Sequence, residues 1–211
     1  AGGHLDSLRD DYITQMEQRV LDPVGMPSTS FGVAGADVAA YHALPHAFQL
    51  DGSLAPLDIE QESGLEPIMP AGGAWSTVDD LAHFVITALN QGVSSDGERV
   101  VSAASLAETW QPQVAVGADT SYGLGWFVDD YQGQPVTHHG GNTIGFTSDL
   151  AFMPDADLGI VVLANAQGAN VFTNAVRVRL FELAFGQEPQ MAESLAFALE
   201  QQEDLSADAA D

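Results

Sequence analysis

The sequence contains no cysteine and no lysine, and both absences restrict the chemistry that the chain can perform. Without cysteine it has neither disulfides nor a thiolate nucleophile, and its redox compartment stays undetermined. All five basic residues are arginine. Long apolar runs are also absent, so no segment is predicted to span a bilayer, and the first residues do not resemble a signal peptide.

Basic residues are outnumbered by 30 acidic residues, which gives a formal net charge of −25. Such a charge repels nucleic acid and anionic membranes, so neither is expected as a partner. The acidic residues are dispersed along the chain, which favours a general adaptation of the surface over one acidic binding site. Dispersed acids with little lysine are typical of proteins from salt-loaded environments, where salt screens the repulsion, and an ordinary acidic protein is the alternative. The compartment itself is not predicted.

Hydrophobic residues make up 45% of the chain, as in a folded globular protein. Apolar residues at helical spacing predict a helix over residues 5–21, ended by Asp22-Pro23. Residues 32–70 show little periodicity and are predicted to form a long surface loop. A second helix is expected after a cap at Ser76 or Thr77 and stops at Gly92, and a shorter one spans residues 103–110.

The period then changes to that of strands. Short β-rich runs at residues 122–128, 134–138, 146–154 and 158–165 predict an antiparallel meander, followed by a helix over residues 171–185. The predicted fold class is therefore α/β, or α+β in detail: an antiparallel sheet with packed helices. Residues 1–186 are assigned to this domain, and the acidic tail 187–211 is predicted to be part helical and part disordered.

One stretch of the predicted sheet, HHGGN at residues 138–142, carries residue types suited to an active site. Its glycines let a ligand approach the backbone and leave N–H groups free to donate. A histidine beside them can donate to a developing oxyanion or orient a nucleophile. A plain turn with two solvated histidines is an equally acceptable interpretation at this point.

Four segments in order resemble the second half of the β-lactamase-related serine hydrolases, a group that includes class C β-lactamases, D-Ala-D-Ala carboxypeptidases and family VIII esterases. RVLDPVGMPSTSF resembles that family's helix-to-loop segment. The others are PAGGAWSTVDDLAHF, YGLGWFV and HHGGNTIGF followed by LAFMPDADLGIVVLAN. The resemblance covers residues 5–185 and implies a β-lactamase/transpeptidase-like fold.

The resemblance also implies roles for individual residues. His139-Gly140-Gly141 matches the His-x-Gly variant of the family's Lys-Thr-Gly motif on a strand edge. By resemblance, the catalytic residues in this chain are His139, Gly141 and Asn142, with the backbone N–H of Asn142 as one oxyanion donor. The implied substrate-binding residues are Gly72, Gly73, Trp75, His138 and Gly140.

The family's other two motifs are missing. No Ser-x-x-Lys can occur in a chain without lysine, and none of the four tyrosines begins a Tyr-x-Asn motif. Both motifs precede the RVLDPVGM-like segment in the family, so the first half of the domain is predicted to be absent from this chain. The chain is then expected to be part of a hydrolase acting on a small-molecule or peptide substrate, with the missing half or a companion chain as its partner. Alone it is expected to be inactive.

Three alternatives stay open. The first is a noncatalytic binding or partner subunit that keeps the fold. The second is a nucleophile elbow at Thr143 within GNTIG, although the elbow needs a helix after it and FTSDLAF is predicted to continue as a strand. The third is a metal-dependent hydrolase using His42 and His46, although Pro45 breaks the helix that their spacing needs. No metal and no organic cofactor are implied by the main interpretation.

Overall fold

The structure is a computed structural model that describes residues 2–37 and 41–197. It is a mixed α/β fold with helices and a six-stranded sheet, which confirms the predicted fold class. The chain divides into two compact units. Within the described residues, the first unit comprises 2–37, 41–42, 62–139 and 150–161, and the second comprises 43–61, 140–149 and 162–197. In this described part, none of the helices combines the length and the hydropathy needed to cross a membrane.

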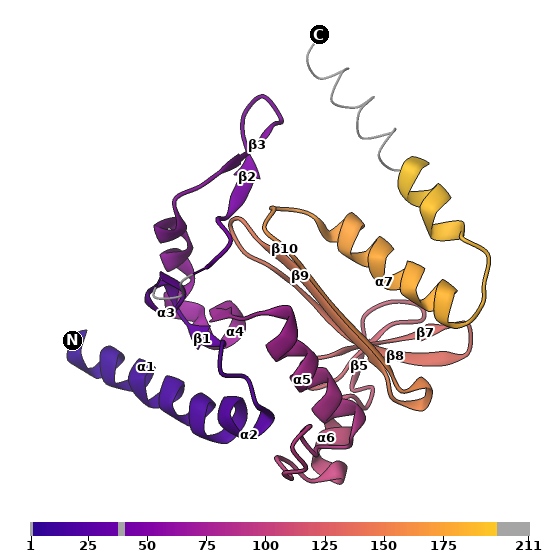
Figure 1. The fold of residues 1–211 in the computed structure, drawn as a ribbon, viewed down its shortest axis with the longest axis horizontal. Coiled ribbons are helices and arrows are strands. Elements are labelled where there is room, and N and C mark those ends of the chain that lie inside the picture. Colours follow the sequence, from indigo (N-terminus) through magenta and orange to yellow (C-terminus); the bar gives the residue numbers. More distant parts are fainter. Residues whose placement is uncertain (1, 38–40, 198–211) are drawn as a thin grey trace. The chain divides into compact units, whose positions relative to one another are not determined.

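The main sheet confirms the predicted meander, because its strands are neighbours in space in the same order as in the sequence (Figure 1). The order is β10-β9-β8-β7-β6-β5, and the pairings of β5 with β6, β6 with β7 and β7 with β8 are antiparallel. The strands are β5 (Val114–Ala115), β6 (Ser121–Tyr122), β7 (Phe127–Tyr131), β8 (Gln134–Asn142), β9 (Thr147–Met153) and β10 (Leu158–Ala164). A short 3-10 turn, η3 (Pro154–Ala156), joins the last two.

The prediction of one strand at residues 122–128 is wrong, because these residues belong to two strands, β6 and β7, joined by a turn. Gly125 adopts φ 92°, in the left-handed region that favours glycine. The N–H of Gly123 donates to the carbonyl of Trp126 at 2.8 Å, and that of Leu124 donates to Thr109 at 2.7 Å. The turn therefore reverses the chain between Tyr122 and Phe127, which places these two residues opposite one another on β6 and β7.

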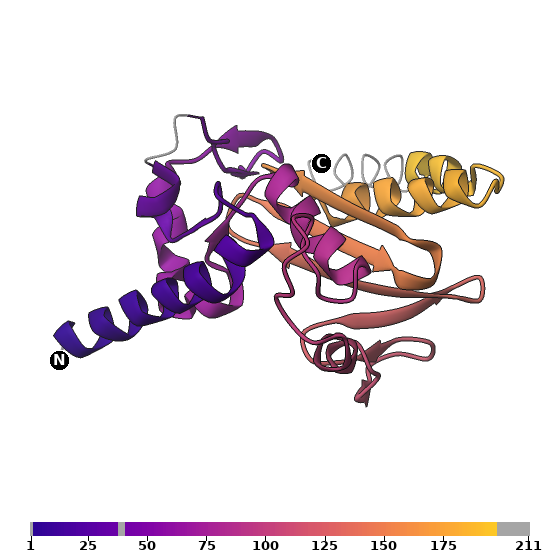
Figure 2. The same cartoon turned by 60° about the horizontal axis from the view of Figure 1, so that its bottom comes forward.

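The first helix runs from Gly2 to Val24, so the prediction that Asp22-Pro23 ends it is wrong by about one turn. It comprises α1 (Gly2–Met16), a π-helical segment η1 (Glu17–Leu21) and α2 (Asp22–Val24), and in Figure 2 it is the long indigo helix. The N–H of Asp22 bonds to the Glu17 carbonyl, five residues back, immediately before Pro23. The helix ends at Gly25, whose φ is 84°.

Residues 32–70 are more structured and more buried than the predicted surface loop. They contain α3 (Val33–Asp37), the hairpin β2 (His46–Phe48) and β3 (Leu54–Pro56), and η2 (Ile59–Ile68). α4 (Met69–Gly72) follows, and β4 (Ala74–Trp75) pairs with β1 (Ser30–Phe31). Val33, Ile59 and Met69 are all buried. Most of these elements are two to five residues long, too short for a helical or strand period to be read from sequence.

Helix α5 (Val78–Leu89) confirms the second predicted helix and anchors the core of the first unit. Thr77 caps it by accepting the N–H of Asp80. The buried Asp80 carboxylate in turn accepts the N–H of Ser28 at 2.8 Å and the hydroxyl of Thr29 at 2.7 Å. Farther along α5, a cluster centred on Val85, Ala88 and the fully buried Phe152 includes both Trp110 and Trp126. α6 (Ala103–Thr109) confirms the shorter predicted helix.

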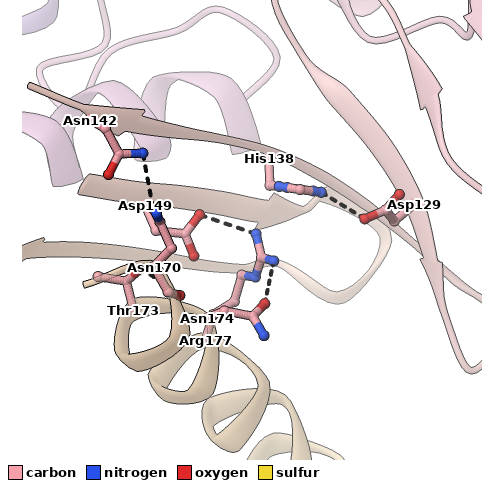
Figure 3. Close-up of polar contacts among 8 residues, drawn as sticks. All are labelled: Asp129, His138, Asn142, Asp149, Asn170, Thr173, Asn174 and Arg177. Carbon is pink, nitrogen blue, oxygen red and sulfur yellow. Dashed lines mark hydrogen bonds and ion pairs between the residues drawn. The ribbon is translucent and has the colours of Figure 1, made fainter. Parts of the chain in front are cut away.

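In the second unit, α7 (Asn170–Ala184) confirms the last predicted helix and is fixed by ion pairs. Arg177 Nη1 lies 3.1 Å from Asp149 Oδ1, with both side chains largely buried, and Arg177 Nη2 donates to Asn174 (Figure 3). Arg179 binds Glu182 at 3.0 Å, and Glu182 also accepts the N–H of Met191 at 2.7 Å. Within the predicted tail, residues 190–197 are helical, and residues 198–211 lie outside the described residues.

Glu182 gives this unit a defined response to acid. Burial acts to raise the pKa of its carboxyl, but the hydrogen bonds from Met191 and Arg179 outweigh it, so the pKa lies below its ordinary value. The ionised carboxylate therefore contributes stability above the unfolded pKa of about 4.3, and this contribution is lost as pH falls through the folded pKa. We expect Glu182→Gln to show a smaller fall in the free energy of unfolding between about pH 7 and pH 3 in urea titrations.

Glu188→Gln is the matched control, because Glu188 is exposed and lies in the same segment. It is expected to keep the pH slope of the unmodified chain. Equal slopes for the unmodified chain and the Glu182 variant would contradict the assignment.

Candidate active site

Strand β8 carries five of the eight residues predicted for the site, in the unbroken run His138 to Asn142. Its pairing with β7 ends at His138, which lies opposite Phe127, whereas β8 itself continues to Asn142. The last four residues of β8 therefore extend beyond the end of β7. Of these, His139, Gly140 and Asn142 are exposed.

His138 forms an ion-pair contact with Asp129 of β7 that sequence reasoning did not identify. Its Nε2 lies 2.7 Å from Asp129 Oδ2, and the imidazole is only 14% exposed (Figure 3). The ring is stacked on that of Phe127, with centroids 5.6 Å apart and planes inclined by 23°. Asp129 is two residues from Phe127 along β7, so both side chains lie on the same face of the sheet. The sequence FVDDY contains this spacing, but the contact can be predicted only once the register of β7 with β8 is known.

His139 contacts a second residue that was not predicted, Tyr122 of β6. The hydroxyl of Tyr122 lies 3.2 Å from His139 Nε2, and the two rings meet edge to face. Phe127 contacts both rings, with its centroid 4.8 Å from Tyr122 and 5.6 Å from His139. Two histidines, a tyrosine and a phenylalanine thus form one cluster at the end of β7.

Gly140 and Gly141 lie beside Ser148 of β9, and the two glycines have different amounts of space. A Cβ built on Gly140 would be 3.5 Å from the Ser148 carbonyl oxygen, an ordinary contact. A Cβ on Gly141 would be 2.6 Å from the Ser148 hydroxyl, which would have to rotate away. Gly141 therefore permits the close approach of β8 to β9, as the glycine-rich sequence suggested.

Asn142, at the end of β8, uses its side chain to fix neighbouring segments. Its Nδ2 donates to Asn170 Oδ1 at 3.0 Å (Figure 3), and its Oδ1 lies 3.2 Å from the hydroxyl of Thr147. Asn170 is the first residue of α7. The side chain is thus occupied by structural contacts, and the catalytic role predicted for Asn142 depends on its backbone N–H.

The remaining predicted residues lie outside the main sheet: Gly72 ends α4, Gly73 follows it, and Trp75 is in β4. Trp75 pairs with Ser30 in the two-stranded sheet of β1 and β4, and the Gly73 carbonyl accepts the N–H of Gly32 at 2.9 Å. A Cβ on Gly73 would be 2.9 Å from the Met69 backbone, whereas Gly72 has open space around it. These residues fix the entrance to α5, and their predicted role in substrate binding stays a prediction.

The structure also bears on two alternative sites, the nucleophile elbow at Thr143 and the metal site at His42 and His46. Residues 143–146 form a turn, with the Thr143 N–H bonded to the Phe146 carbonyl, and lead into strand β9. A nucleophile elbow needs a helix there, so that alternative is wrong. His46 lies in β2, where its Nδ1 is 2.9 Å from the Leu44 carbonyl and 3.2 Å from Asn165. Across residues 2–37 and 41–197, no group of three or more His, Cys, Asp or Glu side chains is arranged to hold a metal ion.

Comparison with known proteins decides the family. The beta-lactamase family model matches residues 6–185, which is most of the chain. The chain belongs to the beta-lactamase family. This confirms the resemblance that the four sequence segments suggested.

The relatives are longer proteins. Penicillin-binding protein 4 of Amycolatopsis lactamdurans is 36% identical over 129 residues, which is 58% of this chain and 34% of that protein. Unguisins hydrolase ungD' of Aspergillus campestris (strain IBT 28561) is 26% identical over 166 residues, 76% of this chain and 30% of that protein. The structure of the octameric penicillin-binding protein homologue from Pyrococcus abyssi is 20% identical, with a TM-score of 0.69 over 85% of this chain and 39% of that one. The chain thus spans about a third of the curated relatives that it matches.

The turn after β8 provides a test of the geometry around the candidate site. A Cβ on Gly145 would be 2.3 Å from Pro45 Cβ and 2.8 Å from the backbone nitrogen of His46, and backbone cannot rotate away. We expect Gly145→Ala to lower the free energy of unfolding by about 2 to 3 kcal/mol. Gly140→Ala, whose new Cβ makes only an ordinary contact, should cost less than about 1 kcal/mol in the same urea titration. Equal costs for the two variants would show that the 44–46 segment does not lie against the turn.

Proposed function

We propose that this chain is part of a serine hydrolase that cleaves an ester, amide or β-lactam bond of a small-molecule or peptide substrate through an acyl-enzyme. The observation that carries the proposal is the position of His139-Gly140-Gly141 on β8, beyond the end of β7, in a chain of the beta-lactamase family. An exposed histidine and a strand with little side-chain bulk leave room for a substrate carbonyl. The name of one relative, a hydrolase of unguisins, is consistent with a hydrolytic reaction.

In this proposal the catalytic residues of the chain are His139, Gly141 and Asn142. The backbone N–H of Asn142 donates to the oxyanion that forms when a serine hydroxyl attacks the substrate carbonyl. His139 lines the cleft and donates a hydrogen bond to the substrate or to the catalytic groups. Gly72, Gly73, Trp75, His138 and Gly140 are assigned to substrate binding, with His138 held by Asp129.

The nucleophilic serine and its lysine and tyrosine partners come from a companion segment in this proposal. A lysine-free chain cannot supply Ser-x-x-Lys, and the chain matches only 34% and 30% of its curated relatives. Two apolar surfaces are suited to contact such a companion. β10, one of the two edge strands of the sheet, is LGIVVLA without a charge, and α7 exposes Val171, Phe172 and Leu183. An uncharged edge strand and an apolar helix face are surfaces that proteins normally cover.

The experiment is an intact-mass measurement of the protein purified with its native partners, before and after reaction with a fluorophosphonate probe. We expect a second polypeptide to copurify and to take the label. In this assembly His139→Ala should slow labelling by about 10²-fold, the typical loss for one oxyanion donor or cleft hydrogen bond. His42→Ala, at an exposed loop position, should leave the rate unchanged.

Two outcomes would overturn the proposal. Stoichiometric label on this chain would place the nucleophile here and invalidate the assigned roles. A single unlabelled polypeptide would favour a noncatalytic binding subunit that keeps the family fold.

We also propose that the chain is adapted to high salt. Its net charge of −25 creates repulsion over distances comparable to the Debye length, which falls from about 10 Å at 0.1 M salt to about 3 Å at 1 M. We expect the unfolding temperature to rise by roughly 5 to 10 °C between 0.1 M and 1 M KCl. For a domain of this size, that rise corresponds to an increase of about 2 to 3 kcal/mol in the free energy of unfolding. Screening predicts the same rise in NaCl and a plateau above 1 M, and a constant unfolding temperature would contradict it.

A further inference from the structure

The end of β7 allows an unusual contact across three strands. Tyr122 of β6 and His138 of β8 both lie opposite Phe127 of β7, one on each side. His139 follows one residue after this last pair, where β7 no longer runs beside β8. Its ring extends past the end of β7, and its Nε2 lies 3.2 Å from the Tyr122 hydroxyl.

The surrounding rings hold the two partners in this position. Phe127 contacts Tyr122 edge to face at 4.8 Å and lies 5.6 Å from His139 with an inclination of 34°. The ring of His138 is also stacked on Phe127, and it is tied to Asp129 by the 2.7 Å contact. Movement of His139 away from Tyr122 would therefore disturb a packed aromatic cluster, which gives the contact more rigidity than its exposure alone suggests.

The contact distinguishes the two nitrogens of His139. Nε2 faces Tyr122, and within the described part of the chain no residue is seen to hydrogen-bond to Nδ1. A neutral imidazole has one N–H and one acceptor nitrogen, and the hydrogen bond at one nitrogen determines which tautomer is present. A phenol is a strong donor and the bare imidazole nitrogen a strong acceptor, so the favoured arrangement has the Tyr122 O–H donating to Nε2 and the proton of the ring on Nδ1.

We propose that Tyr122 is a positioning residue that holds His139 in the Nδ1–H tautomer, with Nδ1–H as the donor presented to the substrate. The assignment of a substrate to this donor rests on the proposed function, whereas the tautomer does not. In the opposite tautomer, with the proton on Nε2, Nδ1 would be an acceptor and would repel a carbonyl or carboxylate oxygen. Tyr122 thereby determines whether His139 attracts or repels the group that an acyl-transfer site has to stabilise.

The test is a long-range proton–nitrogen NMR correlation of the histidine rings in the uniformly ¹⁵N-labelled chain, at about pH 8.5, where an ordinary imidazole is neutral. The His139 signals are identified by their disappearance in His139→Gln. We expect protonated Nδ1 and unprotonated Nε2 in the unmodified chain. In Tyr122→Phe the ring is expected to revert to mainly Nε2–H, the tautomer that free imidazole side chains favour.

Tyr41→Phe is the matched control, because Tyr41 is 97% exposed, and it should leave the His139 signals unchanged. Unaltered His138 signals in Tyr122→Phe show that the sheet is intact, since His138 depends on the same Phe127. An Nε2–H tautomer in the unmodified chain overturns the proposal whether or not the variant folds. Unchanged His139 signals in a folded Tyr122→Phe chain overturn it as well.

Activity of the assembly with its companion separates this inference from the proposed function. Loss of a correctly oriented donor should lower kcat/KM of Tyr122→Phe by about tenfold or more, because general acid–base groups typically contribute 10² or more. An inactive assembly whose His139 is in the Nδ1–H form would overturn the proposed function and leave the positioning role of Tyr122 intact. An active assembly with the Nε2–H form would overturn the positioning role alone.

Discussion

The geometry around the end of β8 depends on the hydrogen bonds of the Thr147 hydroxyl. It is almost completely buried, donates to the Ala166 carbonyl at 2.8 Å and accepts the N–H of Ala169 at 3.1 Å. The same oxygen, Thr147 Oγ1, also lies 3.2 Å from Asn142 Oδ1. One side chain at the start of β9 therefore joins the last residue of β8 to the segment that begins α7. Leaving such buried groups unpaired costs about 1 to 3 kcal/mol, so the backbone at Asn142 is held far more firmly than an exposed strand end normally is.

Four of the five arginines of the chain form contacts that stabilise the fold. Arg177 and Arg179 bind carboxylates within the second unit, Arg9 binds Glu66 in the first, and Arg99 donates to the carbonyls of Gln91 and Val101. Among these, Arg177 with Asp149 is the most buried pair, and the loss of one partner from such a pair is strongly destabilising. Attractive electrostatics are thus concentrated at a few contacts, while the remaining acidic residues repel one another.

The sequence predicted those parts of the fold whose period extends over many residues. The apolar stripe of α5, the β-rich runs of β9 and β10 and the helix α7 each extend far enough along the sequence to be recognised. The segment 32–70 was misjudged because its elements are too short to repeat. The break of residues 122–128 into two strands depends on the left-handed conformation of Gly125, whereas the sequence of these residues was interpreted as one β-rich run.

For the site, the sequence predicted the residues on one strand but not their partners. His138 and His139 were recognised because they stand beside each other and beside glycines in the sequence. Asp129 and Tyr122 come close to them only through the register of β7 with β8 and of β6 with β7. Cross-strand register depends on turns and on the pattern of the whole sheet, and no local motif encodes it.

The uncharged edge of β10 has a consequence for the colloidal behaviour of the chain. Natural sheets protect their outer strands with charges, prolines or bulges, because an open row of backbone donors and acceptors pairs readily with another copy. The sequence of β10, LGIVVLA, contains neither a charged residue nor a proline. Two copies of the isolated chain are instead kept apart by their net charge, a long-range barrier that salt removes. Under the salt adaptation proposed above, added salt therefore stabilises the folded chain and at the same time favours strand-to-strand association, so solubility and conformational stability change in opposite directions.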